Sequence, residues 1–130
     1  MSYQSMKEAF LNAITFGQRQ RAKAREASFD PDEFLRTFRA LPNDAARYIY
    51  LRSQPSFSQP MAMLNSRAVN FGAWVNAMDY NALLGGYSVH SVRWTPQGFV
   101  GPNGPLPRDA KMTWATVGGV PAFNGELILR

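Results

Sequence analysis

Apolar side chains recur at helical spacing in the first 27 residues, behind a recognisable start signal. Ser5 and Glu8 have the spacing of a capping box, in which the hydroxyl takes a backbone N–H of the first turn and the carboxylate reaches back. The apolar positions are then 4, 3, 1 and 3 residues apart, which places them on one helix face: Met6, Phe10, Ala13, Ile14 and Gly17. This pattern predicts a helix over roughly residues 5–27, whose second half has good helix formers but nothing large to bury.

Two further helix starts follow directly. Asp30 can cap a helix whose first position is Pro31, and Glu33 completes another capping box. The buried face of this helix consists of Phe34, Leu35, Phe38 and Leu41, and Pro42 ends it. Asn43 can then cap a third helix. The sequence therefore predicts helices over roughly 31–41 and 44–53.

A polar segment with two prolines separates these helices from a fourth. Residues 54–65 are expected to form a linker or a loop across a surface. Ser66 is expected to cap the next helix, roughly 66–84, whose apolar positions alternate at spacings of 3 and 4: Ala68, Phe71, Val75, Met78 and Ala82. Gly85 and Gly86 are expected to end it.

The remaining chain changes to β-branched and aromatic residues with tight turns. We expect a small antiparallel β element over roughly 87–95, 111–117 and 120–129, with a proline- and glycine-rich loop at 101–109. Pro121 restricts its strand to a sheet edge or a bulge. The expected fold class is α+β in one domain, 1–130. A subdivision into a helical part (1–53), a linker (54–65) and a helix-plus-β part (66–130) is possible.

The composition is that of a folded chain with few groups for catalysis. The 130 residues are 45% hydrophobic and include one histidine, His90. They include no cysteine, and this absence excludes disulfides, thiolate nucleophiles and cysteine-bound zinc. The serines do not lie in a Gly-x-Ser-x-Gly motif, and the acids Asp79, Asp109 and Glu126 are far apart in sequence. We therefore expect a protein that is not an enzyme and that uses neither a cofactor nor a metal.

The chain also lacks the patterns of membrane insertion and export. It has no run of 18 apolar residues, and its first residues lack the apolar stretch of a signal peptide. We expect no membrane partner and no export by a signal peptide, so that the protein is cytoplasmic or incorporated into a virion or another large assembly.

Charge is distributed unevenly along the chain, which carries a formal net charge of +5. Residues 1–53 hold 15 charged side chains, whereas the 77 residues that follow hold 8 and are rich in aromatic residues, Met, Asn and Gly. A surface with little charge and many aromatic residues is typical of a protein interface. The candidate interface residues are Trp74, Trp94, Met112, Trp114 and Phe123, although the tryptophans could equally fill the core.

This composition favours a non-catalytic structural or assembly subunit that contacts other protein subunits in a homo- or hetero-oligomer. A small component of a virion, such as a tailed-phage capsid, neck or tail, is one setting that uses such subunits.

A basic run in the first predicted helix supports an alternative. Four cations fall within seven residues: Arg19, Arg21, Lys23 and Arg25. Steps of two residues turn the direction by about 200° on a helix, so these side chains point to opposite sides. The helix is therefore expected to project into solvent, where it could contact nucleic-acid phosphates non-specifically, contact an acidic protein surface, or simply be solvated.

Overall fold

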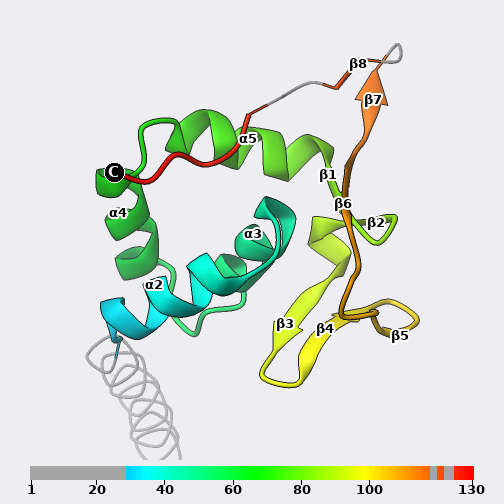
Figure 1. Ribbon diagram of the computed structural model, residues 1–130, viewed down its shortest axis with the longest axis horizontal. Coiled ribbons are helices and arrows are strands. Elements are labelled where there is room, and N and C mark those ends of the chain that lie inside the picture. The colour runs from blue at the N-terminus through cyan, green and yellow to red at the C-terminus, as the bar shows by residue number, and fades with distance from the viewer. Residues whose placement is uncertain (1–28, 118–119, 122–124) are drawn as a thin grey trace, which may run out of the picture. The chain divides into compact units, whose positions relative to one another are not determined.

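The computed structural model describes residues 29–117, 120–121 and 125–130, of which residues 31–130 form one compact unit. Its helices come first and its short strands follow, so the predicted α+β class is confirmed (Figure 1). The predicted helix 5–27, with its basic run, and the candidate interface residue Phe123 lie outside the described residues.

The first two described helices agree with the predicted ones. α2 spans Pro31–Ala40, with acidic residues in its first turn and Phe34, Leu35 and Phe38 buried. α3 spans Asp44–Arg52. Asn43 caps α3 as expected, because its side-chain oxygen accepts a hydrogen bond from the backbone N–H of Ala46 at 2.8 Å.

The next two helices differ from the prediction. α4 spans Ser58–Arg67, so most of the expected linker is helical. Pro60 is buried in its first turn, where a missing N–H costs no helical hydrogen bond. Ser66 lies inside α4 and does not cap a helix; its hydroxyl donates to the carbonyl of Met63. α5 spans Phe71–Asn81 and is shorter than the predicted 66–84.

The predicted fourth helix ends early because residues 82–84 form the central strand of a sheet. β1 (Ala82–Leu84) pairs antiparallel with β2 (Tyr87–Ser88) on one side and with β6 (Met112–Trp114) on the other. Gly85 and Gly86 connect β1 to β2 with φ angles of 61° and 86°, which side chains with a Cβ rarely adopt.

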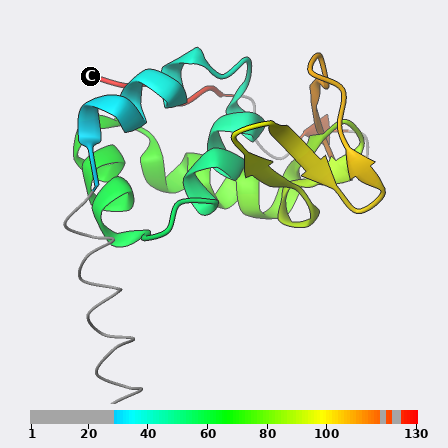
Figure 2. The same cartoon turned by 90° about the horizontal axis from the view of Figure 1, so that it is seen from below.

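A second sheet follows within the region predicted as strand 87–95 and loop 101–109. After the 3₁₀ turn η1 (Val89–Ser91), β3 (Arg93–Thr95) pairs with β4 (Gly98–Gly101), and β4 pairs with β5 (Gly104–Pro105). Residues 87–95 are therefore two strands separated by a 3₁₀ turn rather than one continuous strand. Figures 1 and 2 show the strands grouped at one side of the helices.

The predicted strands 111–117 and 120–129 are also shorter than expected. β7 (Thr116–Val117) follows β6 after a break at Ala115, whose N–H donates to the carbonyl of Asn81. β7 pairs with β8 (Val120–Pro121) in a two-stranded sheet. Residues 125–130, which we call the closing segment, return to the helices and form a single antiparallel bridge between Leu129 and Ala68 (Figure 1).

The core of the unit is centred on Trp74, whose exposed fraction is 0%. Its ring contacts those of Phe38, Tyr48 and Phe71, with centroids 5.8–6.4 Å apart. The core thus joins α2, α3 and α5. None of the helices in the described part of the chain has the length and apolar content needed to cross a membrane.

Candidate functional site

The structure separates the described candidate interface residues into three places. Trp74 is completely buried in the core, so its side chain is unavailable to a partner, and the alternative role as a core residue applies to it. Met112 and Trp114 are half-buried and line one surface hollow, whereas Trp94 lines two others. Composition alone does not distinguish these three places.

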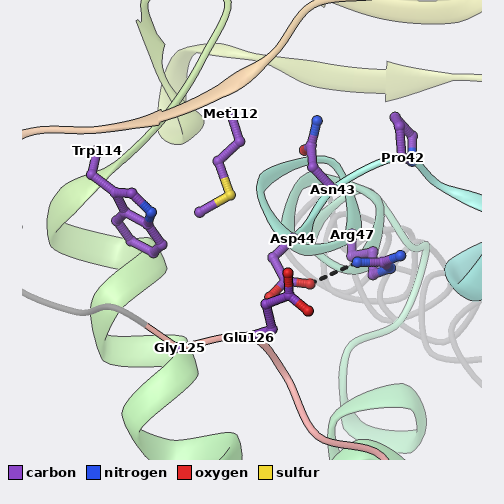
Figure 3. Close-up of a pocket in the computed structure, with 8 residues that line it drawn as sticks. All are labelled: Pro42, Asn43, Asp44, Arg47, Met112, Trp114, Gly125 and Glu126. Atoms are coloured by element: carbon purple, nitrogen blue, oxygen red, sulfur yellow. Dashed lines mark hydrogen bonds and ion pairs between the residues drawn. The ribbon is translucent and has the colours of Figure 1, made fainter.

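The first hollow, which we call the Asp44 hollow, has a volume of about 370 Å³. It lies between β6, the start of α3 and the closing segment (Figure 3). The side chains of Met112 and Trp114 face it from one side and those of Asn43 and Arg47 from the other. Its polar centre is the ion pair between Asp44 and Arg47, whose Oδ1 and Nη1 atoms are 2.7 Å apart.

Both members of this ion pair are occupied by structural hydrogen bonds. Arg47 also donates from Nε to the carbonyl of Phe38 at 3.1 Å and from Nη2 to the carbonyl of Leu41 at 2.9 Å. The second carboxylate oxygen of Asp44 accepts from the N–H of Leu127 at 2.9 Å. The pair therefore joins the end of α2, the start of α3 and the closing segment. Its hydrogen bonds account for a role in the stability of the fold rather than in a reaction.

Asn70 also holds the closing segment, at the residues on either side of Leu127. Its Nδ2 donates to the carbonyl of Glu126 at 2.7 Å, and its Oδ1 accepts from the N–H of Ile128 at 2.9 Å. Two backbone hydrogen bonds extend this contact, from Val69 to the carbonyl of Ile128 and from Arg130 to that of Arg67. Asn70 immediately precedes α5, and its side chain makes no capping hydrogen bond to that helix.

The second hollow, which we call the Trp94 hollow, has a volume of about 520 Å³ and is mainly apolar. Trp94 lies directly opposite Phe99 in the β3–β4 pairing. On its other side, the ring of Trp94 packs on Tyr50 of α3, with centroids 4.6 Å apart. The remaining walls come from the α2–α3 connection, the β3–β4 hairpin and the segment after β4: Leu41, Thr95, Pro96, Gln97, Gly98, Val100, Pro105, Leu106, Pro107 and Arg108.

The third hollow, which we call the Arg52 hollow, has a volume of about 530 Å³ and shares Trp94 and Thr95 with the second. It is lined at the end of α3 by Arg52 and Ser53 and near β3 by His90, Val92 and Arg93. The residues lining it include two arginines and a histidine but no acidic residue. Sequence reasoning missed this grouping because 37 positions separate Ser53 from His90 and no local spacing indicates that they line one hollow.

A polar cluster lies beside the Arg52 hollow. The hydroxyl of Tyr48 donates to the carboxylate of Asp79, and Nε2 of His90 lies 2.8 Å from the carbonyl oxygen of Asp79 and 3.8 Å from its carboxylate. Arg52 stands over the ring of Tyr48 at 5.7 Å. Such rings and charges stabilise each other where water is partly excluded.

Ser53 and His90 line the same hollow, but they do not form the arrangement of a serine hydrolase. The hydroxyl of Ser53 donates to the carbonyl of Ile49 at 2.7 Å and accepts from the N–H of Trp94 at 3.1 Å. Its proton is thus directed to the backbone and not to an imidazole, whereas a nucleophilic serine donates to its base. Among the described residues, no three His, Asp or Glu side chains gather closely enough to hold a metal ion.

Comparisons with known proteins add no relative: no protein-family model, curated protein or solved structure matches this chain.

Proposed function

We propose that this protein is a non-catalytic structural or assembly subunit that contacts another protein subunit through the Trp94 hollow. The observation that carries the proposal is the gathering of apolar side chains around this open hollow, on a short hairpin at the surface. Exposed apolar patches rimmed by polar groups are typical of protein contact sites. Aromatic residues and few charges are the composition that interface centres favour.

A second exposed apolar contact supports the same proposal. Val69 and Ile128 are 59% and 56% exposed, and they lie side by side because the N–H of Val69 bonds to the carbonyl of Ile128. Two β-branched side chains held at the surface by fixed backbone bonds offer a rigid apolar contact to a neighbouring subunit. Rigid contacts lose little conformational entropy on binding.

The proposal includes a setting: a large particle such as a tailed-phage capsid, neck or tail. Small subunits in such particles are covered by neighbours on several sides, and such a neighbour would cover the open apolar hollow. The alternative, non-specific nucleic-acid contact through Arg19, Arg21, Lys23 and Arg25, is supported by the sequence run alone.

The test is the native mass of the purified chain, measured by light scattering over a concentration series at low and high salt. Without its partner, the apolar hollow is expected to drive self-association above 14.6 kDa that persists at high salt. Phe99→Ser should lower this association. Tyr80→Ser is the matched control, because Tyr80 is an aromatic residue that is 82% exposed on α5, outside the hollow.

A monomer of 14.6 kDa at both salt concentrations would overturn the proposal. Equal effects of the Phe99 and Tyr80 substitutions would also overturn it, because they would show general stickiness rather than a contact at the hollow. Circular dichroism of each variant establishes that its fold is intact.

A further inference from the structure

The Trp94 and Arg52 hollows adjoin each other, since Trp94 and Thr95 line both. We call the combined surface the Trp94–Arg52 groove. One half is apolar and includes Phe99 and Leu106, and the other is lined by the cationic side chains of Arg52 and Arg93 together with His90. An occupant that covers both halves must therefore be amphipathic.

The charge of the groove defines the sign of its occupant. Its lining residues include three arginines, Arg52, Arg93 and Arg108, and no aspartate or glutamate. None of the three arginines forms an ion pair within the part of the chain that the structure describes. The carboxylate of the polar cluster, that of Asp79, accepts a hydrogen bond from the hydroxyl of Tyr48 and faces His90.

Arg52 is also restrained in position. It stands over the ring of Tyr48, and its Nη1 atom lies 3.5 Å from the carbonyl of Val89. A guanidinium held by such contacts loses less side-chain entropy when it binds a carboxylate than a freely rotating one does. The basic half is thus partly organised for an anionic ligand.

The apolar half of the groove favours one of two anionic ligands, an acidic protein segment, over the other, a nucleic acid. Single-stranded nucleic acid binds by stacking bases on free aromatic faces. Here the ring of Trp94 already packs on Tyr50, with centroids 4.6 Å apart, and prolines and aliphatic side chains form most of the remaining lining. Walls of this kind suit an inserted aliphatic or aromatic side chain better than a stack of bases.

We propose that the Trp94–Arg52 groove binds an acidic segment of a partner protein. A large apolar side chain of that segment occupies the half near Phe99 and Leu106, and its carboxylates contact Arg52 and Arg93. Arginine and carboxylate form paired hydrogen bonds of matching geometry. This inference rests on the proposed assembly function and names the chemistry of the partner at the same surface.

The probe is a displayed library of short random peptides, selected on the intact chain and then synthesised for fluorescence anisotropy. Selected peptides should carry two or more carboxylates next to a large apolar residue, and their affinity should fall as salt rises. The double variant R52A/R93A should weaken binding by about tenfold or more. The double variant R36A/R39A, which removes the same charge from two exposed positions on α2, should change it by less than about twofold.

Three results would overturn the inference. The selection could yield no acidic peptides, the two double variants could weaken binding equally, or oligothymidylate could bind with the same dependence on Arg52 and Arg93 and compete with the peptides. The last result would assign the groove to nucleic acid.

The outcome is independent of the native-mass experiment. Self-association that depends on Phe99 without selection of acidic peptides would refute only this inference. Acidic peptides that bind a strictly monomeric chain would refute only the self-association expected of the isolated chain and would leave this inference standing.

Discussion

Replacing Asp44 with alanine is expected to destabilise the unit of residues 31–130 by about 3 kcal/mol. The carboxylate of Asp44 is only 5% exposed and joins two segments that are far apart in sequence. One oxygen pairs with Arg47 and the other accepts from the N–H of Leu127. Alanine removes both contacts and leaves the N–H of Leu127 without its acceptor.

The magnitude follows from three contributions. Arg47 is 26% exposed and keeps its bonds to two carbonyl groups, so the lost ion pair contributes only about 1 kcal/mol. The lost bond from Leu127 to a charged acceptor contributes about 1.5 kcal/mol. Asp44 is also the first residue of α3, where a negative charge stabilises the helix by about 0.5 kcal/mol.

Urea unfolding measures this change, and thermal unfolding should show a midpoint lower by roughly 15 °C. Asp44→Asn keeps an acceptor for Leu127 and should lose about half as much stability. Asp109→Ala removes an exposed carboxylate and should stay within about 0.5 kcal/mol of the native chain. A loss below about 1 kcal/mol for Asp44→Ala, or one equal to that of Asp109→Ala, would refute the reasoning.

Three further predictions concern the turn, the closing segment and the core. Gly86→Ala should lower the stability by about 1 kcal/mol or more, because the φ angle of Gly86 is 86°, although no atom lies within 4 Å of the added Cβ. Gly72→Ala inside α5, where the added Cβ also has no atom within 4 Å, should raise the stability by about 0.5 kcal/mol. Urea unfolding of both variants checks the opposite signs, and two losses of equal size would contradict them. Asn70→Ala should cost about 1–2 kcal/mol and speed hydrogen exchange at Ile128, and unchanged exchange there would show that Asn70 does not hold this segment. Trp74→Phe should cost no more than about 2 kcal/mol by thermal unfolding, because the indole N–H is buried with no hydrogen-bond partner among the described residues. Full truncation of this side chain to alanine should cost about 4 kcal/mol. A cost of that size for Trp74→Phe would show that the N–H is paired.

Local signals in the sequence predicted the parts of the fold that local interactions determine. The capping side chain of Asn43, the proline at the first position of α2 and the spacing of Phe34 and Phe38 each act within one or two helical turns. These signals placed α2 and α3 to within one or two residues. The glycine pair at Gly85 likewise marked a turn, although it joins two strands instead of ending a helix.

Other features depend on contacts between distant residues and gave no local signal. α4 has a proline in its first turn and a weak apolar face, so only its packing through Leu64 and Pro60 distinguishes it from a loop. Residues 82–84 continue the helical spacing of α5, and the two neighbouring strands make them extended.

The candidate site was predicted in part for the same reason. Aromatic composition directed attention to Trp94, which lines two hollows, but the same criterion included Trp74, whose ring is in the core. The cations of the groove come from α3 and β3, and tertiary packing alone brings Arg52 and Arg93 together. The Asp44–Arg47 pair has the spacing of neighbours on a helix, which was an available signal.

The closing segment also has a consequence for the order of folding. The bond from Leu127 to Asp44 connects residues 83 positions apart, and the bonds from Asn70 span 56 and 58 positions. Contacts of such sequence separation form late, because a long loop must close before they contribute. During synthesis, α3, α4 and α5 are therefore made well before the residues that join them at their edge. Until residues 126–130 leave the ribosome, the carboxylate of Asp44 and the amide of Asn70 lack these backbone partners, and the helical part of the fold is held together by its core and by the hydrogen bonds of Arg47 and Tyr48.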